Sequence, residues 1–537
     1  MKLDYNSSKD TYVLRMPRNV HKETEIMQVH GFDKSKPLSS MEESVLYTDS
    51  PYAALEFFDF GTPRAKSNLD RLKAAVDASW RQDDGPVAHS LRTPDGQDLW
   101  PFQVHGVHYA LQRQHALIGD QPGLGKTAQA IVVSNELRAQ NNLVICPANI
   151  RLQWRKMIRA WSTMEGHYMI YPVMGAKTGV HPTAPWTIIS YDLARSPRFQ
   201  SVLMQRRYDH LILDEAHYLK NPDALRTQAI LSDLDGIMSV CDKVTALSGT
   251  PLPNRPNECF TLANALDPSS IDWMDKEDFD YRYNQKAPKW PFEAKGRLGE
   301  LQNRLRANFM VRRLKKDVLT QLPEIQYEVI QVDKTGAIRK ALEAEEMLGL
   351  DPERLAEEGA TGAYPDMVGA ISTVRKMMGV AKAPQVADYV DMVMDGGEEK
   401  LFLVAWHHDV MDILEKELSK WGVVRIDGKT SPFRRNQNLE DFKNDPRKGI
   451  CLGQMQAIGT GTDGLQEVCR HALFAEFDWV AGNIQQCVDR LHRGGQRDGV
   501  LAEFLVAPGS LDEKVLGSAL GKLQDIHDAL DNRRDWK

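Results

Sequence analysis

The sequence has no long apolar run, no paired cysteines and no strong net charge, and each absence excludes a class of protein. No run approaches the roughly 18 apolar residues that a membrane-spanning helix requires. No apolar core follows the first six residues, so we expect no signal peptide. The six cysteines include no Cys-x-x-Cys pair, which argues against a zinc ribbon or redox motif and is typical of a reducing cytoplasm. At a net charge of −7, any contact with nucleic acid has to come from local basic patches.

Size and patterning predict several domains, the first of them small. The 537 residues exceed what one core usually organises, and 42% hydrophobic with 26% charged residues is typical of globular proteins. Residues 1–90 are expected to form an α+β accessory domain, followed by a linker at 83–86. Its expected strands are Tyr12–Met16, Ile26–Val29 and Ser44–Tyr47, and its expected helix is Ser67–Trp80.

The segment from Asp120 to Thr127, with the sequence Asp-Gln-Pro-Gly-Leu-Gly-Lys-Thr, is the feature around which the chain is organised. The apolar run 116–118 before it predicts a strand, and the run 128–133 after it predicts a helix. A strand, a glycine-rich loop, Lys-Thr and a helix in this order are typical of a phosphate-binding loop. The strict pattern has glycine where Asp120 stands, and a chance glycine-rich turn is the alternative interpretation.

The residue types of this loop suit the binding of ATP together with Mg²⁺. Gly123 and Gly125 would allow backbone N–H groups to surround the phosphates, and the N-terminus of the following helix adds favourable partial charge. Lys126 would reach the β- and γ-phosphates, and the Thr127 hydroxyl would hold Mg²⁺.

Continuous apolar runs after the loop predict a parallel sheet that is buried on both faces. These runs are Leu143–Cys146, Trp186–Ser190, His210–Leu213 and Val244–Leu247. The segments between them suit helices, so we expect a doubly wound α/β domain with its functional groups at the carboxyl ends of the strands.

Acidic and small polar residues stand at those predicted strand ends. Asp214 would hold Mg²⁺ through water, and Glu215 would polarise the attacking water. The turn 248–251, Ser-Gly-Thr-Pro, is expected to link the nucleotide site to a second surface. A solvated helix start is the alternative for an isolated Asp-Glu-Ala-His, but its place after an apolar strand disfavours that alternative.

A basic run between residues 286 and 316 is a candidate nucleic-acid footprint in an otherwise acidic chain. Its basic residues are Lys286, Lys289, Lys295, Arg297, Arg304, Arg306, Arg312, Arg313, Lys315 and Lys316. Trp290 and Phe292 are interleaved with them. A solvated helix face is the alternative. The acidic residues 340–360 that follow predict an exposed insertion.

A second α/β series follows, without a phosphate loop of its own. Its apolar runs are Leu401–Ala405, Val423–Ile426, Ile450–Leu452 and Ala472–Ala475. Arg490 and Arg493 are three residues apart on a predicted helix, so we expect them to share a face and act as arginine fingers on the γ-phosphate. A surface arginine pair is the alternative.

These motifs together resemble the superfamily-two helicase-like ATPases of the Swi/Snf type over about residues 97–525. The resemblance rests on an ordered set: Pro101–Gln103, Asp120–Thr127, Cys146–Ala148 with Gln153 and Trp154, Asp214–His217 with Leu219–Asn221, Leu247–Pro251, Phe309–Val318, Asp427–Ser431 with Arg435, and Gln486–Gln496. The Arg-Arg-Leu-Lys-Lys-Asp-Val and Asp-Arg-x-His-Arg-x-Gly-Gln runs are the most specific. The aspartate at 120 is usual in that family. The segments 404–408, 425–428 and 474–479 look most like the HARP-type branch of annealing helicases, and the N-terminal unit resembles a HARP domain.

The resemblance implies roles for further residues. Gln103 is expected to contact adenine and Gln486 to belong to the nucleotide site. Residues expected along the DNA are Trp154, Ser190, Lys220, His407, Thr430 and Trp479. One departure lies at 460–466, where the family's glycine-rich run is replaced and Asp463 and Gln466 stand.

The sequence therefore predicts an α/β protein with two RecA-like, doubly wound parallel-sheet lobes and a small N-terminal accessory domain. The expected boundaries are 1–90, 91–325 with a basic helical insertion at about 255–318, a linker and insertion at 326–399, 400–500, and a brace at 501–537. The expected activity is ATP- and Mg²⁺-dependent translocation on double-stranded and branched DNA, by a monomer that meets replication or recombination proteins and no membrane. An ATPase that recycles RNA polymerase or displaces proteins, and a nucleotide-regulated DNA-binding module without motor activity, are the alternatives.

Overall fold

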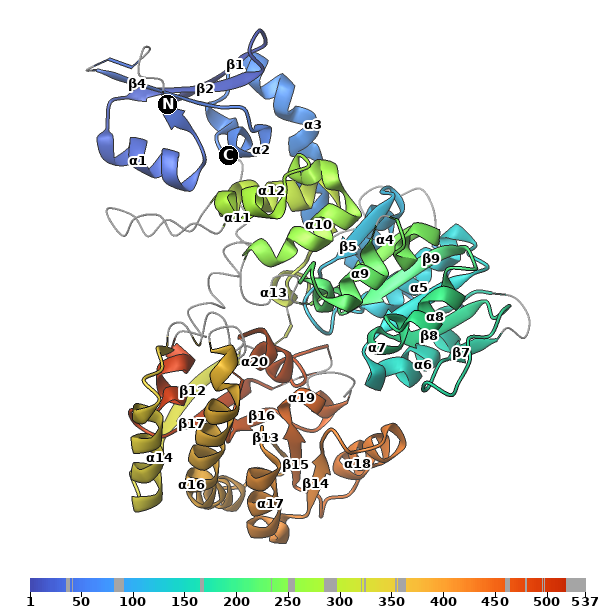
Figure 1. Ribbon diagram of the computed structural model, residues 1–537, viewed down its shortest axis with the longest axis vertical. Coiled ribbons are helices and arrows are strands. Elements are labelled where there is room, and N and C mark those ends of the chain that lie inside the picture. Colours follow the sequence, from blue (N-terminus) through green and yellow to red (C-terminus); the bar gives the residue numbers. More distant parts are fainter. Residues whose placement is uncertain are drawn as a thin grey trace. The chain divides into compact units, whose positions relative to one another are not determined.

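The computed structural model describes most of the chain as two compact units with a boundary between Val318 and Leu319. The described residues are 1–517 except 35–38, 41, 82–90, 165–168, 233, 250–255, 284–296, 320, 323–324, 353–354, 356–363, 459–463, 479–480, 495 and 497. Among them, no helix is both long and apolar enough to cross a membrane. Figure 1 labels many of the elements of both units.

The first unit begins with a four-stranded antiparallel sheet in the order β1-β2-β4-β3. Its elements are β1 (Lys2–Asn6), β2 (Thr11–Pro17), α1 (Val20–Val29), β3 (Asp33–Lys34), β4 (Glu43–Thr48), α2 (Pro51–Leu55) and α3 (Pro63–Trp80). Two predicted strands and the predicted helix are confirmed. The strand predicted at Ile26–Val29 is wrong, because Asn19 accepts the Lys22 N–H and caps a helix that runs through these residues.

The first unit continues with a seven-stranded parallel sheet in the order β11-β5-β10-β9-β6-β8-β7. Its strands are β5 (His115–Ile118), β6 (Asn142–Cys146), β7 (Ile170–Pro172), β8 (Trp186–Ser190), β9 (Tyr208–Asp214), β10 (Cys241–Leu247) and β11 (Met310–Val311). Its helices are α4 (Pro101–Leu111), α5 (Lys126–Leu137), α6 (Arg151–Trp161), α7 (Tyr191–Ala194), α8 (Pro197–Leu203), α9 (Leu225–Leu231), α10 (Phe260–Leu266), α11 (Lys276–Tyr283), α12 (Leu298–Asn308) and α13 (Lys315–Val318). All five predicted strands are confirmed.

Burial on both faces explains why these strands are continuous apolar runs. Along β6, Leu143 and Ile145 enter one hydrophobic core, while Val144 and Cys146 enter another. Successive side chains of a strand point to opposite faces, so both faces of the sheet are covered. The predicted doubly wound domain is therefore confirmed.

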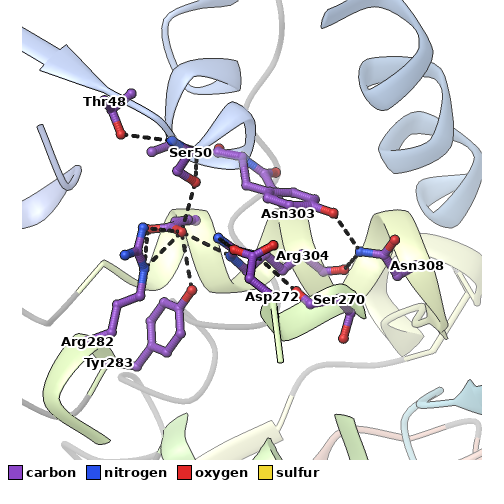
Figure 2. A network of polar contacts seen from close by, with 12 residues as sticks. Thr48, Ser50, Ser270, Asp272, Arg282, Tyr283, Asn303, Arg304 and Asn308 are labelled. Atoms are coloured by element: carbon purple, nitrogen blue, oxygen red, sulfur yellow. Dashed lines mark hydrogen bonds and ion pairs between the residues drawn. The ribbon is translucent and has the colours of Figure 1, made fainter. Parts of the chain in front are cut away.

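The antiparallel sheet and the parallel-sheet lobe are joined by a buried cluster of polar groups around Glu300 on α12 (Figure 2). Ser50, which caps α2, donates to Glu300 Oε1 at 2.9 Å. Arg282 Nη2 and Arg304 Nε donate to the same carboxylate at 2.8 and 3.0 Å, and Tyr283 adds a bond of 3.2 Å. Burial alone would raise the pKa of Glu300, but the two guanidinium groups hold it below its ordinary value. The first 80 residues are thus anchored to α12 by a charge that water does not reach.

The second unit holds a six-stranded parallel sheet in the order β12-β17-β16-β13-β15-β14. Its strands are β12 (Ile325–Gln331), β13 (Leu401–Ala405), β14 (Val423–Ile426), β15 (Ile450–Gln454), β16 (His471–Phe474) and β17 (Val500–Val506). Its helices are α14 (Gly336–Met347), α16 (Val368–Asp395), α17 (His408–Glu417), α18 (Pro432–Asn444), α19 (Met455–Ile458) and α20 (Ala481–Val488). The four predicted strands are confirmed.

The second sheet extends beyond the range 400–500 on both sides, because β12 pairs with β17 and β17 pairs with β16. The acidic segment at 340–360 is also more than an exposed insertion. Its first part belongs to α14, where Ile338 and Ala341 are buried in the core that α16 shares.

Candidate nucleotide site

The phosphate loop leaves β5 and enters α5 with the geometry that its glycines predict. Gly123 and Gly125 have φ angles of 88° and 75°, a region that side chains disfavour. Gly125 is the N-cap of α5, so the helix begins at Lys126 and its first N–H groups have no partner within the helix. This helix end, beside two glycines and a lysine, is suited to binding a phosphate group.

The side chains at the ends of the loop lie close to it. Lys126 Nζ donates to the Asp120 carbonyl at 2.7 Å, and burial lowers the pKa of the amine. Gln103, in the first turn of α4, accepts the Trp100 N–H at 2.9 Å. A Cβ built on Gly125 would clash with Gln103 Nε2, so the predicted adenine-contacting residue lies directly beside the loop.

Asp120 begins the loop, and its carboxylate is hydrogen-bonded on both oxygens. Its side chain is fully buried, and Oδ1 accepts the Arg313 N–H at 2.9 Å while Oδ2 accepts Gln129 Nε2 at 3.0 Å. Arg313 Nε lies 3.3 Å from Oδ1 as an ion pair. The carboxylate is bound inside the lobe, and the expected place of Asp120 in the nucleotide site stays a prediction.

Asp214 ends β9, two strands from β5, and its carboxylate is held on both oxygens. Trp154 Nε1 donates to Oδ2 at 2.7 Å, and the Glu215 N–H donates to Oδ1 at 2.9 Å. The Tyr191 hydroxyl donates to the Asp214 carbonyl at 2.8 Å. Burial, together with the charge of Glu215, raises the pKa of Asp214 above its ordinary value.

Glu215 has a left-handed backbone with φ of 51°, which is strained for a residue with a side chain. His217 Nδ1 lies 3.4 Å from Glu215 Oε2 and 3.2 Å from Ser248 Oγ at the end of β10. Burial lowers the pKa of His217 to about 4, so the imidazole is neutral at pH 7. A neutral histidine therefore connects the acidic turn to the next strand end.

The donor set at these strand ends fits Mg²⁺. A hydroxyl from Thr127 and a carboxylate from Asp214 are hard oxygen ligands of the kind that Mg²⁺ prefers. Two neighbouring carboxylates in a buried site disfavour each other's charge, and a divalent cation would compensate them.

Most residues that were expected to contact DNA in the first unit are engaged within it. Trp154 is buried against Asp214, as described above. Ser190 is buried at the end of β8, and Lys220 forms an ion pair of 2.6 Å with Glu258. Trp154 therefore belongs to the support of the acidic turn, and its predicted place on a DNA-facing surface is wrong.

The predicted basic footprint is wrong for the arginines and the lysine that follow α12. Arg312, Arg313 and Lys315 are no more than 3% exposed. Arg312 Nη1 donates to the carbonyls of Gly119 and Gly249 at 2.6 and 3.1 Å. Lys316 is exposed, as predicted. Lys286, Lys289, Trp290, Phe292 and Lys295 lie outside the described residues.

In the second unit, the strand ends carry polar groups that bind one another. Glu476 accepts the His407 N–H at 2.9 Å and pairs with His407 Nδ1 at 2.7 Å. Thr430 Oγ1 donates to Asp427 Oδ1 at 3.0 Å. Trp479 and residues 460–463 lie outside the described residues.

The prediction that Arg490 and Arg493 lie on a helix is wrong, because α20 ends at Val488 and both follow in a turn. Arg493 is buried, and its Nε donates to the Asp489 carbonyl at 3.0 Å. Gln486, on α20, is buried. Their roles towards ATP stay predictions.

Sequence reasoning missed two residues of the first-unit site. Gln129 supports Asp120, and Tyr191 supports Asp214. Neither belongs to a motif, and only their places next to the phosphate loop and to Ser190 could have suggested them.

A phosphate-binding loop and an acidic turn on one edge of a parallel sheet define the P-loop class of nucleotide-binding proteins. Comparison with protein families refines this. The SNF2-related domain family matches residues 102–355, and the helicase conserved C-terminal domain family matches residues 385–495. The chain belongs to the Swi/Snf-type family of superfamily-two helicase-like ATPases, which confirms the resemblance drawn from the motifs.

Relatives among characterised proteins agree with this family. The human "DNA annealing helicase and endonuclease ZRANB3" is 30% identical over 452 residues, which are 81% of this chain and 41% of that protein. The Xenopus tropicalis "SWI/SNF-related matrix-associated actin-dependent regulator of chromatin subfamily A-like protein 1" is 29% identical over 446 residues, 79% of this chain and 45% of that protein. The chain thus spans less than half the length of these two relatives. Among solved structures, the "Sulfolobus solfataricus SWI2/SNF2 ATPase core in complex with dsDNA" aligns with 83% of this chain and 100% of that chain, at 18% identity and a TM-score of 0.40.

Proposed function

We propose that this protein hydrolyses ATP and uses it to translocate along double-stranded DNA, remodelling branched DNA by annealing, fork reversal or branch migration. The observation that carries the proposal is the placement of Lys126 and Thr127 at the start of α5 on the same sheet edge as Asp214 and Glu215. The proposal of DNA as the substrate rests on family membership, and the proposal of branched DNA rests on the relative named as an annealing helicase.

The site residues divide into those that bind and those that act on water. The α5 N-terminus and Lys126 bind the phosphates, and Thr127 with Asp214 would hold Mg²⁺, which neutralises phosphate charge when bound. Glu215 orients the attacking water and accepts its proton. Trp154 and Tyr191 keep the acidic turn in place. The neutral His217 hydrogen-bonds to Ser248 and so links the acidic turn to the end of β10.

The test is the rate of ATP hydrolysis on a panel of duplex, single-stranded, forked and four-way DNA and of RNA, with Glu215→Gln as the matched inactive control. We expect stimulation by duplex DNA, and annealing or branch migration on forked and four-way substrates. Stimulation by RNA alone would favour the polymerase-recycling alternative. Nucleotide binding without DNA-stimulated hydrolysis would favour a binding module without motor activity.

A further inference from the structure

The segment from Met310 to Lys315 runs beside β5 and continues beside the phosphate loop. The Gly119 N–H donates to the Val311 carbonyl at 2.7 Å, and the Gln121 N–H donates to the Arg313 carbonyl at 3.1 Å. The Lys315 N–H donates to Gln121 Oε1 at 2.7 Å. The end of the first unit is therefore hydrogen-bonded to the loop on both sides of Asp120.

Asp120 is the centre of this attachment. Its two oxygens bind Arg313 and Gln129, and Arg313 also donates to the Phe102 carbonyl. A Cβ built on Gly106 of α4 would clash with Gln129 Oε1 and Arg313 Nη2. Both ends of the pair are fully buried, so no neighbouring space would accept a displaced guanidinium. The aspartate in place of the pattern's glycine thus fixes where the loop begins.

The N-terminal domain reaches the same segment through α3. Ser79 Oγ donates to the Met310 carbonyl at 2.8 Å and accepts Arg306 Nη1 at 3.1 Å. The Arg306 guanidinium lies 3.3 Å from the centre of the Trp80 ring and donates to the Arg312 carbonyl at 3.2 Å. Ser79 and Arg306 are fully buried. Ser79 of α3 and Arg306 of α12, which contacts Trp80 of α3, therefore hold the backbone that holds Asp120.

We propose that Asp120 and Arg313 are a positioning pair for the phosphate loop, and that helix α3 of the N-terminal domain is part of the same support through Ser79 and Arg306. The domain then sets how well the loop binds nucleotide, in addition to any contact that it makes with DNA. This inference rests on the proposed ATP site and names residues that act on it without touching the nucleotide.

The chain offers a matched pair of serines for the test. Ser79 and Ser50 are both buried, both lie in the N-terminal domain and both hydrogen-bond to α12, but only Ser79 contacts the segment beside the loop. Ser79→Ala is expected to weaken the binding of a fluorescent ATP analogue by about 3- to 10-fold, the loss of one or two buried hydrogen bonds. Both serine variants are expected to lower Tm by similar amounts. Only Ser50→Ala is expected to leave nucleotide affinity unchanged.

Asp120→Asn tests the pair itself, because it keeps the shape of the side chain and removes the charge that Arg313 faces. We expect about a tenfold loss of nucleotide affinity, and less than additive losses when Asp120→Asn is combined with Ser79→Ala. The losses of Asp120→Asn and Ser50→Ala should be additive when the two changes are combined, because Ser50 bonds Glu300 and does not contact the segment beside the loop. Coupling of this kind is not expected from a merely structural role.

The outcomes separate this inference from the proposed function. Equal nucleotide affinity in wild type, Ser79→Ala and Asp120→Asn would overturn the positioning roles while leaving the ATP site intact. Failure of the wild-type protein to bind the analogue would instead overturn the proposed function. If Ser79→Ala does not fold, Arg306→Lys is measured in its place, and unchanged affinity in that variant would also count against the inference.

Discussion

The two parallel sheets are built alike and differ at their carboxyl ends. In both, alternate residues of a strand enter separate cores, as at Leu143 and Val144 in the first and at Leu403 and Val404 in the second. In the first sheet the acidic turn is strained, and its two acids disfavour each other's charge. In the second, the acid that follows β16, Glu476, is satisfied by a histidine and two backbone N–H groups. The same fold thus supports chemistry in one sheet and a closed polar turn in the other.

Buried histidines on central strands make the same contrast. His210 on β9 lies between the hydroxyls of Ser134 and Thr245, and burial lowers its pKa to about 3. His471 on β16 lies 2.7 Å from Glu503. Burial alone would lower the pKa of His471, but Glu398 and Glu503 outweigh it and raise the pKa to about 9. The neighbours, more than the depth of burial, decide which form is stable.

The largest effect is expected at the first sheet's edge. Lys126→Ala and Glu215→Gln should both abolish hydrolysis, but only Lys126→Ala should weaken ATP binding, because the lysine charge acts on bound phosphate and Glu215 acts on water. Turnover and nucleotide affinity, measured on both variants, check this. Equal loss of ATP affinity in the two would contradict the division of roles.

The second sheet's contribution is expected to be confined to turnover. Arg490→Ala and Arg493→Ala should each lower kcat by roughly 10³ while ATP affinity stays near wild type, as arginine fingers do. The exposed Arg447, paired only with Asp445 among the described residues, provides a matched control, and Arg447→Ala should leave kcat unchanged. Turnover near wild type in both variants would show that the assignment of Arg490 and Arg493 as arginine fingers is wrong.

The sequence predicted the sheets better than the edges of the site. Apolar runs buried on both faces are visible in sequence, so nine strands of the two parallel sheets were found. β17 was missed because Glu503 interrupts its pattern, and its partners His471 and Tyr389 are distant in sequence. The prediction from the basic run failed for its buried arginines, because a count of charges does not show which way each side chain points. Arg304 faces Glu300 and Arg313 faces Asp120, so these two arginines of the run are neutralised within the fold.

The two histidines should give the units opposite responses to pH. The pKa of His471 is about 9 in the folded state and about 6.5 in the unfolded chain. Its contribution to the free energy of unfolding, up to about 3 kcal/mol, is therefore complete below pH 6.5 and is lost as pH rises towards 9. His210 binds its proton less tightly, so its contribution is complete above about 6.5 and is lost as pH falls. Calorimetry of the full chain at several pH values, with His471→Gln and His210→Gln, checks this. Each variant should flatten a different side of the profile.

The charged groups around His471 sharpen that measurement. Glu398 and Glu503 face the imidazole, Arg470 faces Glu398, and Tyr389 donates to Glu503 at 2.7 Å. Tyr389→Phe removes one hydrogen bond without changing charge, so it should lower Tm while keeping the alkaline loss of stability. An unchanged alkaline slope in His471→Gln would show that another group is responsible.

The smallest effect separates the exposed lysine of the basic run from its buried neighbour. Lys316 is exposed and Lys315 is 2% exposed, although the two are adjacent in sequence. If Lys316 neutralises one DNA phosphate, Lys316→Ala should reduce the slope of log affinity against log salt by about 0.9, because one condensed counterion fewer is released. Lys315→Ala should leave the slope unchanged and lower Tm, because its side chain is packed within the unit. Affinity for a fixed duplex is measured across a salt series for both variants. Unchanged slopes in both would remove Lys315 and Lys316 from the DNA-binding surface, whereas a reduced slope for Lys315→Ala would show that this side chain leaves its buried position when DNA binds.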